Sequence, residues 1–150
     1  MAAPFTPSSA VDLSRIDFGF FSYGGTNNIE IDLRTDAAGL PGNIIQSWNL
    51  QLTGFQQYIS TVSSNAPLAG NTQYWISVSA LDDQTDVGWF DSYDELLGVV
   101  GFDTGKGWYA CSECFTPALD VIGTPVPEPG TLILLGTTAI GLAGVLRRKL

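Results

Sequence analysis

Apolar and polar residues alternate along much of the first 124 positions. In residues 28–34, Ile29, Ile31 and Leu33 fall on one face and charged residues on the other. That period of two is typical of a strand with one buried face. Similar alternation, or short apolar runs between turn residues, predicts further strands at residues 14–21, 47–52, 55–62, 73–80, 87–90, 96–102 and 118–122. Before residue 130 no apolar stripe keeps helical spacing over the length of a helix. We therefore predict an all-β domain over residues 1–124, an antiparallel β-sandwich or jelly roll.

The last part of the chain, residues 125–150, has a different pattern. Residues 130–146 contain no charged residue and are followed by Arg147, Arg148 and Lys149. A 17-residue helix covers about 25 Å, slightly less than a ~30 Å hydrocarbon core, and flanking basic side chains can snorkel to the interface. A buried core helix is the alternative, but the run is apolar all round and terminal. The pattern predicts one transmembrane helix from Gly130 to Leu146, with its basic end cytoplasmic and the β domain outside.

Charge and composition exclude several functions. Residues 1–124 hold 14 acidic residues against 3 basic ones, a net charge of −11, so they would repel nucleic-acid phosphates. The chain has no histidine, which rules out Ser-His-Asp and Cys-His catalysis and His-ligated metals. Carboxylate chemistry, oxygen-ligated cations and aromatic binding surfaces remain. No motif points to an enzyme.

The two cysteines form a C-x-x-C pair, Cys111 and Cys114. A redox-active pair needs a helix N-terminus in a βαβ setting, and a zinc site needs a second pair of ligands. A disulfide that tightens a loop suits an extracytoplasmic protein, and an inert reduced pair is the other alternative. We predict the disulfide.

Two groups of side chains are candidates for ligand binding. An acidic stretch, with Asp82, Asp83 and Asp86 as the candidate ligands, could bind calcium, although its spacing is not that of an EF-hand and a solvated acidic loop is the simpler interpretation. Trp75 and Trp89 could stack on carbohydrate, the alternative being that they fill the core.

The amino end, MAAPFTPSSAVDLS, lacks the basic start and apolar run of a secretory signal. We expect that a signal peptide and one or two strands precede Met1. A cytosolic protein without a leader is the alternative, and the carboxyl end argues against it.

The carboxyl end resembles a PEP-CTERM sorting signal, because Pro127, Glu128 and Pro129 precede an apolar segment and a short basic end. The resemblance implies recognition by an exosortase, transient anchoring in the inner membrane, and delivery to the cell surface or extracellular matrix of exopolysaccharide-making bacteria. The body resembles choice-of-anchor extracellular domains, a family without an assigned catalytic activity, at Asp36, Gly39, Pro41, Gly42, Gly70, Tyr74 and Trp75.

We therefore expect a non-enzymatic exported protein with a structural or adhesive role at the surface or in the exopolysaccharide. The alternative is a carbohydrate-binding module of the extracellular matrix. We expect no cofactor other than the candidate calcium.

Overall fold

The computed structural model describes residues 1–94 and 96–127, apart from the side chains of residues 56–65. Every regular element in this part is a strand: β1 (Ala2–Phe5), β2 (Val11–Gly24), β3 (Asn28–Asp36), β4 (Pro41–Gln51), β5 (Gln56–Leu68), β6 (Tyr74–Ala80), β7 (Asp86–Trp89), β8 (Leu97–Asp103), β9 (Trp108–Phe115) and β10 (Leu119–Pro125).

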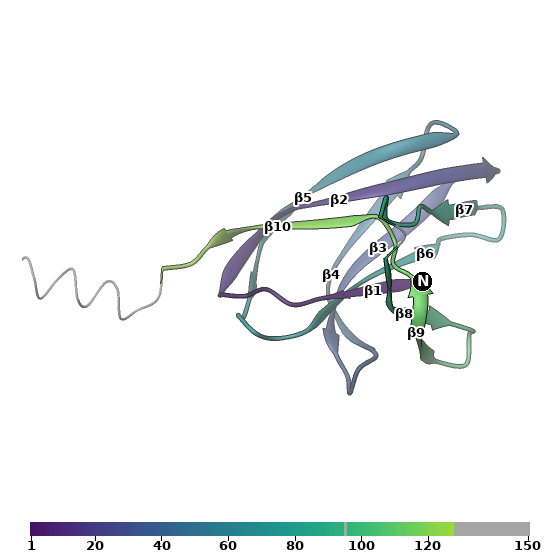
Figure 1. Cartoon of the computed structure of the whole chain (residues 1–150). Coiled ribbons are helices and arrows are strands. Elements are labelled where there is room, and N and C mark those ends of the chain that lie inside the picture. The colour runs from purple at the N-terminus through teal and green to yellow at the C-terminus, as the bar shows by residue number, and fades with distance from the viewer. Residues whose placement is uncertain (95, 128–150) are drawn as a thin grey trace, which may run out of the picture.

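The strands form two sheets, which Figure 1 shows as two layers. The six-stranded sheet has the order β4-β3-β6-β1-β8-β9. The four-stranded sheet has the order β10-β2-β5, and β7 pairs with the far end of β2. All these pairings are antiparallel, so the predicted all-β antiparallel class is confirmed.

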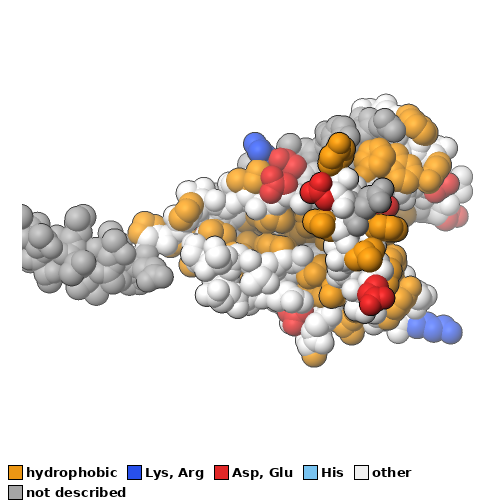
Figure 2. All heavy atoms as spheres, viewed as in Figure 1, with side chains coloured by type: hydrophobic (Ala, Val, Ile, Leu, Met, Phe, Trp, Pro, Cys, Tyr) orange, Lys and Arg blue, Asp and Glu red, His pale blue; other side chains and the backbone are white. Residues whose placement is uncertain are grey.

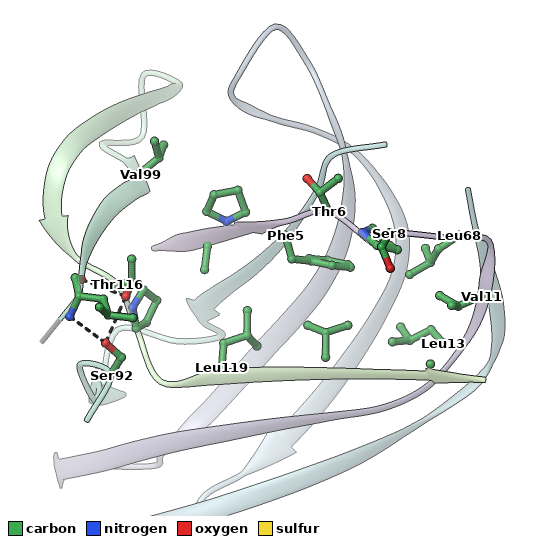
Figure 3. Close-up of a pocket in the computed structure, with 17 residues that line it drawn as sticks. Phe5, Thr6, Ser8, Val11, Leu13, Leu68, Ser92, Val99, Thr116 and Leu119 are labelled. Atoms are coloured by element: carbon green, nitrogen blue, oxygen red, sulfur yellow. Dashed lines mark hydrogen bonds between the residues drawn. The ribbon is translucent and has the colours of Figure 1, made fainter. Parts of the chain in front are cut away.

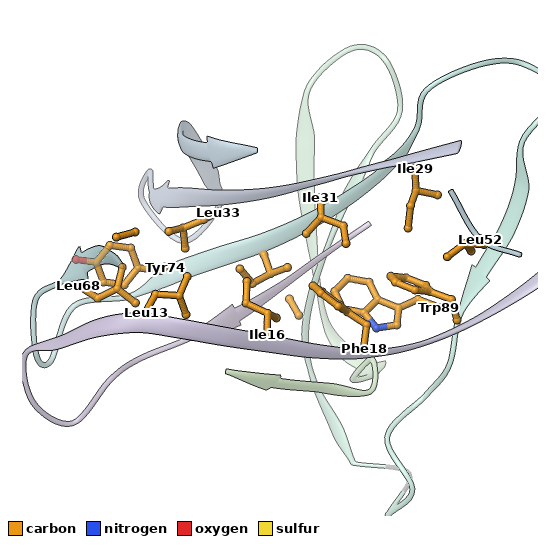
Figure 4. Packing of buried hydrophobic residues seen from close by; sticks show 14 residues of the cluster. Leu13, Ile16, Phe18, Ile29, Ile31, Leu33, Leu52, Leu68, Tyr74 and Trp89 are labelled. Carbon is orange, nitrogen blue, oxygen red and sulfur yellow. The ribbon is translucent and has the colours of Figure 1, made fainter. Parts of the chain in front are cut away.

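The core lies between the two sheets and comes from the predicted alternation. Ile29, Ile31 and Leu33 of β3 are buried and meet Ile16 and Phe18 of β2 in one apolar cluster (Figure 4). Burying one such side chain completely stabilises the fold by about 1.5–3 kcal/mol relative to leaving it exposed. In β3, the period of two therefore identified the face that builds the core.

Two strands were not predicted, β1 and β9. β1 is short, contains Pro4, and lies between β6 and β8, so its strand conformation depends on partners far along the chain. β9 lies at an edge of its sheet and has no period-two burial pattern.

The body extends slightly beyond the predicted boundary at residue 124. Pro125 pairs with Val11, and the Val126 amide donates a hydrogen bond of 3.0 Å to the Ala10 carbonyl.

Candidate functional site

A groove of about 560 Å³ opens between the two sheets (Figure 3). β1 and β8 share the pair Ala2–Gly101 and then part, which leaves an opening in the six-stranded sheet. Phe5 of β1 and Val99 of β8 lie on one side of the groove, and Leu119 of β10 lies on the other. No lining side chain among the described residues is ionisable, so the groove offers apolar contact and no acid or base.

The polar groups at one end of the groove already bond to one another. Thr116 Oγ1 donates a hydrogen bond of 3.0 Å to the Leu96 carbonyl and lies 3.2 Å from Ser92 Oγ. Ser92 Oγ also accepts one from the Leu96 amide at 3.2 Å. This end is therefore braced internally.

The groove also adjoins the start of the tail. Val121 and Gly123 of β10 line it, and β10 continues into Val126, whose amide is bonded to Ala10. The strand that walls the groove is thus the strand from which the tail leaves the body.

A buried ion pair occupies the outer face of the six-stranded sheet. Arg34 Nη2 lies 2.6 Å from Asp32 Oδ2, and the Ser47 hydroxyl donates to Asp32 Oδ1 at 2.6 Å. Arg34 Nε donates to Ser77 Oγ at 2.9 Å, and its guanidinium carbon lies 5.6 Å from the centre of the Trp108 ring. Because Arg34 on β3 reaches Trp108 on β9, the sheet must curve around a second hollow of about 380 Å³. The charges neutralise each other there, which is typical of a structural cluster.

The prediction that Trp75 stacks on carbohydrate is wrong, because its side chain is 0% exposed. Its indole nitrogen donates to Asp36 Oδ1 at 2.8 Å, and the Gly39 amide donates to Asp36 Oδ2 at 3.0 Å. These two hydrogen bonds, Trp75 first, lower the pKa of the Asp36 carboxyl below its usual value. Gly39 has φ of +82°, which glycine adopts at little cost. The Asp36 turn and Trp75 thus form one structural unit.

Trp89 is also buried, so the same prediction is wrong for it. Its ring packs 5.7 Å from both Phe18 and Phe20 in the core, and its indole nitrogen donates to the Ala118 carbonyl at 2.8 Å. Trp89 therefore ties β7 to the segment just before β10.

The acidic stretch holds one carboxylate with many protein donors. The oxygens of Asp82 accept hydrogen bonds of 2.6–3.1 Å from Thr26 Oγ1, Asn28 Nδ2, Gln84 N and Thr85 Oγ1. The hydroxyl of Thr26, the largest cause, and these other donors lower the pKa of Asp82 to about 2. Asp83 and Asp86 are exposed. Among the described residues, no three acidic or cysteine side chains gather closely enough to hold a metal ion, so the calcium prediction gains no support.

The two cysteines form a disulfide, with 5.7 Å between their Cα atoms. The bond lies within strand β9 and not in a loop. Cys111 pairs with Val100 and Cys114 with Gly98, so two residues of β9 face one of β8 between these pairs. The disulfide thus closes a bulge in an edge strand, a common place for such irregularities.

The candidate residues that the sequence missed are three aromatic side chains on the outer face of the four-stranded sheet: Phe21, Tyr23 and Phe90. Alternation along residues 14–21 indicates that Phe21 faces away from Phe20, but it does not show which rings from other strands meet it.

The sorting-tail predictions fall almost wholly outside the described residues. Pro127 is described, whereas Glu128, Pro129, the predicted helix Gly130–Leu146 and the basic residues Arg147, Arg148 and Lys149 are not. Within residues 1–94 and 96–127, no helix is long and apolar enough to cross a membrane.

Comparison with known proteins identifies this tail. A family model for the PEP-CTERM protein-sorting motif matches residues 125–149. No curated protein and no solved structure matches the chain.

Proposed function

We propose that this chain, which carries a PEP-CTERM sorting motif at residues 125–149, is exported to the cell surface and processed by an exosortase, and that its body serves there as a non-catalytic structural or adhesive component. The observation that carries the proposal is that the sorting motif follows β10 without a linker. The match begins at Pro125, the last residue of that strand, so whatever sorts the motif sorts the β-sheet body with it. Among the described residues, the groove in the body has no ionisable lining, which supports a non-catalytic role.

We propose that residues 130–146 anchor the chain transiently in the inner membrane, with the basic end in the cytoplasm and the body outside. Pro127 and Pro129 favour an extended, non-helical connection before the membrane, because each fixes its own backbone and restricts the residue before it. An extended segment is the form in which a processing enzyme can bind a peptide as a strand. The final location is the cell surface or an exopolysaccharide matrix.

Sorting is tested in a bacterial host that has an exosortase, with fractionation of the full chain. We expect wild type as a shortened species at the surface or in the medium, and Glu128→Ala as a full-length species in the membrane fraction. Glu113→Ala, at an exposed acidic residue of β9, is the matched control and should behave like wild type. Normal processing of Glu128→Ala would contradict the proposal.

The role of the body needs a separate measurement. A strain lacking the chain should adhere less to a surface, and the full-length gene should restore adhesion. Purified protein should turn over none of a panel of glycoside and ester substrates, and any turnover that survives repurification would overturn the non-catalytic assignment.

One observation favours the alternative function, a carbohydrate-binding module. Aromatic rings gather on the outer face of the four-stranded sheet, and such rings offer flat apolar area to a sugar.

A further inference from the structure

The outer face of β2 presents aromatic side chains at its far end. Ile16, Phe18, Phe20 and Ser22 are buried, so Arg15, Asp17, Gly19, Phe21 and Tyr23 alternate onto the opposite face. The rings of Phe21 and Tyr23 are 4.8 Å apart at 86°, and Phe21 lies 5.1 Å from Phe90, which follows β7. Figure 2 shows hydrophobic side chains gathered over this end of the molecule. We call Phe21, Tyr23 and Phe90 the aromatic platform.

Two glycines let the platform lie close to the sheet. Gly88 of β7 pairs with Phe21, and a Cβ atom at Gly88 would lie 2.1 Å from Phe21 Cζ. A Cβ atom at Gly19 would lie 3.0 Å from Phe90 Cδ2. Each ring therefore packs against the backbone of the neighbouring strand, which fixes it in place. A fixed ring binds at a smaller entropic cost than a free one.

The ring of Tyr23 stands nearly perpendicular to that of Phe21 and is 66% exposed. The two ring planes therefore meet nearly at a right angle, so that a ligand can contact both rings at once. The phenol oxygen of Tyr23 can donate or accept a hydrogen bond at the open side.

Polar groups continue along the same face of β2. Arg15 Nε lies 3.1 Å from Asp17 Oδ1, and both side chains are partly exposed. Six residue-to-residue steps lead from Asp17 to Tyr23, which is about 20 Å of strand. The face is thus a strip, aromatic at one end and hydrogen-bonding at the other, with the length to hold an extended chain.

The charge distribution indicates which kind of chain. The body has a net charge of −11, and Arg15, the cation of this strip, is paired with Asp17. Anionic polymers are therefore repelled, whereas a neutral sugar chain can stack its apolar ring faces on the platform and bond its hydroxyls to the polar groups. We infer that this face of β2 and β7 binds a neutral polysaccharide, an inference that rests on the proposed surface location.

Binding is tested with the purified full chain in a detergent that has no sugar headgroup. The neutral probes are insoluble cellulose, chitin and curdlan, and alginate is the anionic probe. We expect binding to a neutral probe and none to alginate. Tyr23→Ala should weaken the neutral binding about tenfold, the size of one lost ring contact. Tyr23→Phe should retain most of it.

Tyr93→Ala is the matched control, because Tyr93 is 100% exposed and lies outside the platform. This variant should bind like wild type. Tyr23→Ala should keep the thermal midpoint of wild type, since the side chain is mostly exposed. The inference is overturned if no neutral probe binds, or if Tyr93→Ala weakens binding as much as Tyr23→Ala. It is also overturned if light scattering shows that Tyr23→Ala only dissociates a dimer, since the face would then join two copies. The assay uses purified protein, so its result is independent of whether sorting occurs as proposed.

Discussion

Replacing Arg34 with leucine isolates a carboxylate that the six-stranded sheet has buried. Asp32 is 1% exposed, and its Oδ2 accepts hydrogen bonds from Arg34 Nη2 at 2.6 Å and Arg34 Nε at 3.2 Å. Removing one partner of a buried pair costs about 3–5 kcal/mol. Ser47 and Ser77 still donate to Asp32 in the variant, so we expect the lower end, about 3 kcal/mol. For a domain of this size that corresponds to a thermal midpoint about 10 °C lower.

The assay is urea unfolding of the full chain, followed by tryptophan fluorescence. Arg15→Leu is the matched control, because Arg15 pairs with Asp17 at a half-exposed site and its loss should cost less than about 1 kcal/mol. The double variant Asp32→Leu/Arg34→Leu should be more stable than Arg34→Leu alone, because it leaves no unpaired buried charge. The reasoning would be refuted if Arg34→Leu and Arg15→Leu lowered the free energy of unfolding equally. It would also be refuted if the double variant lost as much stability as Asp32→Leu and Arg34→Leu lose in sum.

Three further predictions concern pH, the disulfide and the Trp75 unit. Asp36 and Asp82 have folded pKa values below the ordinary value near 4, so the contribution of each to stability is present above about pH 4 and is lost as the pH falls through its folded pKa, which is about 2 for Asp82. The thermal midpoint of Asp82→Asn should therefore fall less between pH 4 and pH 2 than that of wild type. Replacing Cys111 and Cys114 with serine should cost about 2 kcal/mol in urea unfolding, because the closed loop is short. Trp75→Phe should lower the free energy of unfolding by about 1–3 kcal/mol in the same assay, because it removes the hydrogen bond to Asp36. A variant as stable as wild type would contradict a stabilising role for that bond.

The sequence predicted best those strands whose apolar residues all lie on one face. In β3 the alternation of Ile29, Ile31 and Leu33 corresponds directly to the core face. β1 could not be found in this way, because four residues that include Pro4 carry little periodic signal and the strand is fixed by β6 and β8. Pairing between segments far apart in the chain is a tertiary property, and local pattern does not encode it.

The aromatic candidates failed for a related reason. Alternation correctly separates Tyr74 and Trp75 onto opposite faces, and only Tyr74 joins the core cluster. It does not reveal that the outer face at Trp75 is itself covered. There Pro41 and Trp75 both pack over Gly101, where a Cβ atom would lie 3.3 Å from each. The platform depends in the same way on the pairing of Phe21 with Gly88, which only the folded register brings about. The sorting motif was predictable because its parts are contiguous in the chain.

The four-stranded sheet connects the two proposed functions spatially. The tail leaves the body at Pro125, which pairs with Val11 at the start of β2. Phe21 and Tyr23 of the aromatic platform belong to the opposite end of the same strand, whose course Figure 1 shows. The twelve residue-to-residue steps from Val11 to Tyr23 span about 40 Å of strand. The platform therefore lies about 40 Å along the strand from the residue that pairs with the start of the tail. β2 pairs with β5 along most of its length and with β10 over Val11–Phe18, so hydrogen bonds to neighbouring strands keep β2 extended over this distance.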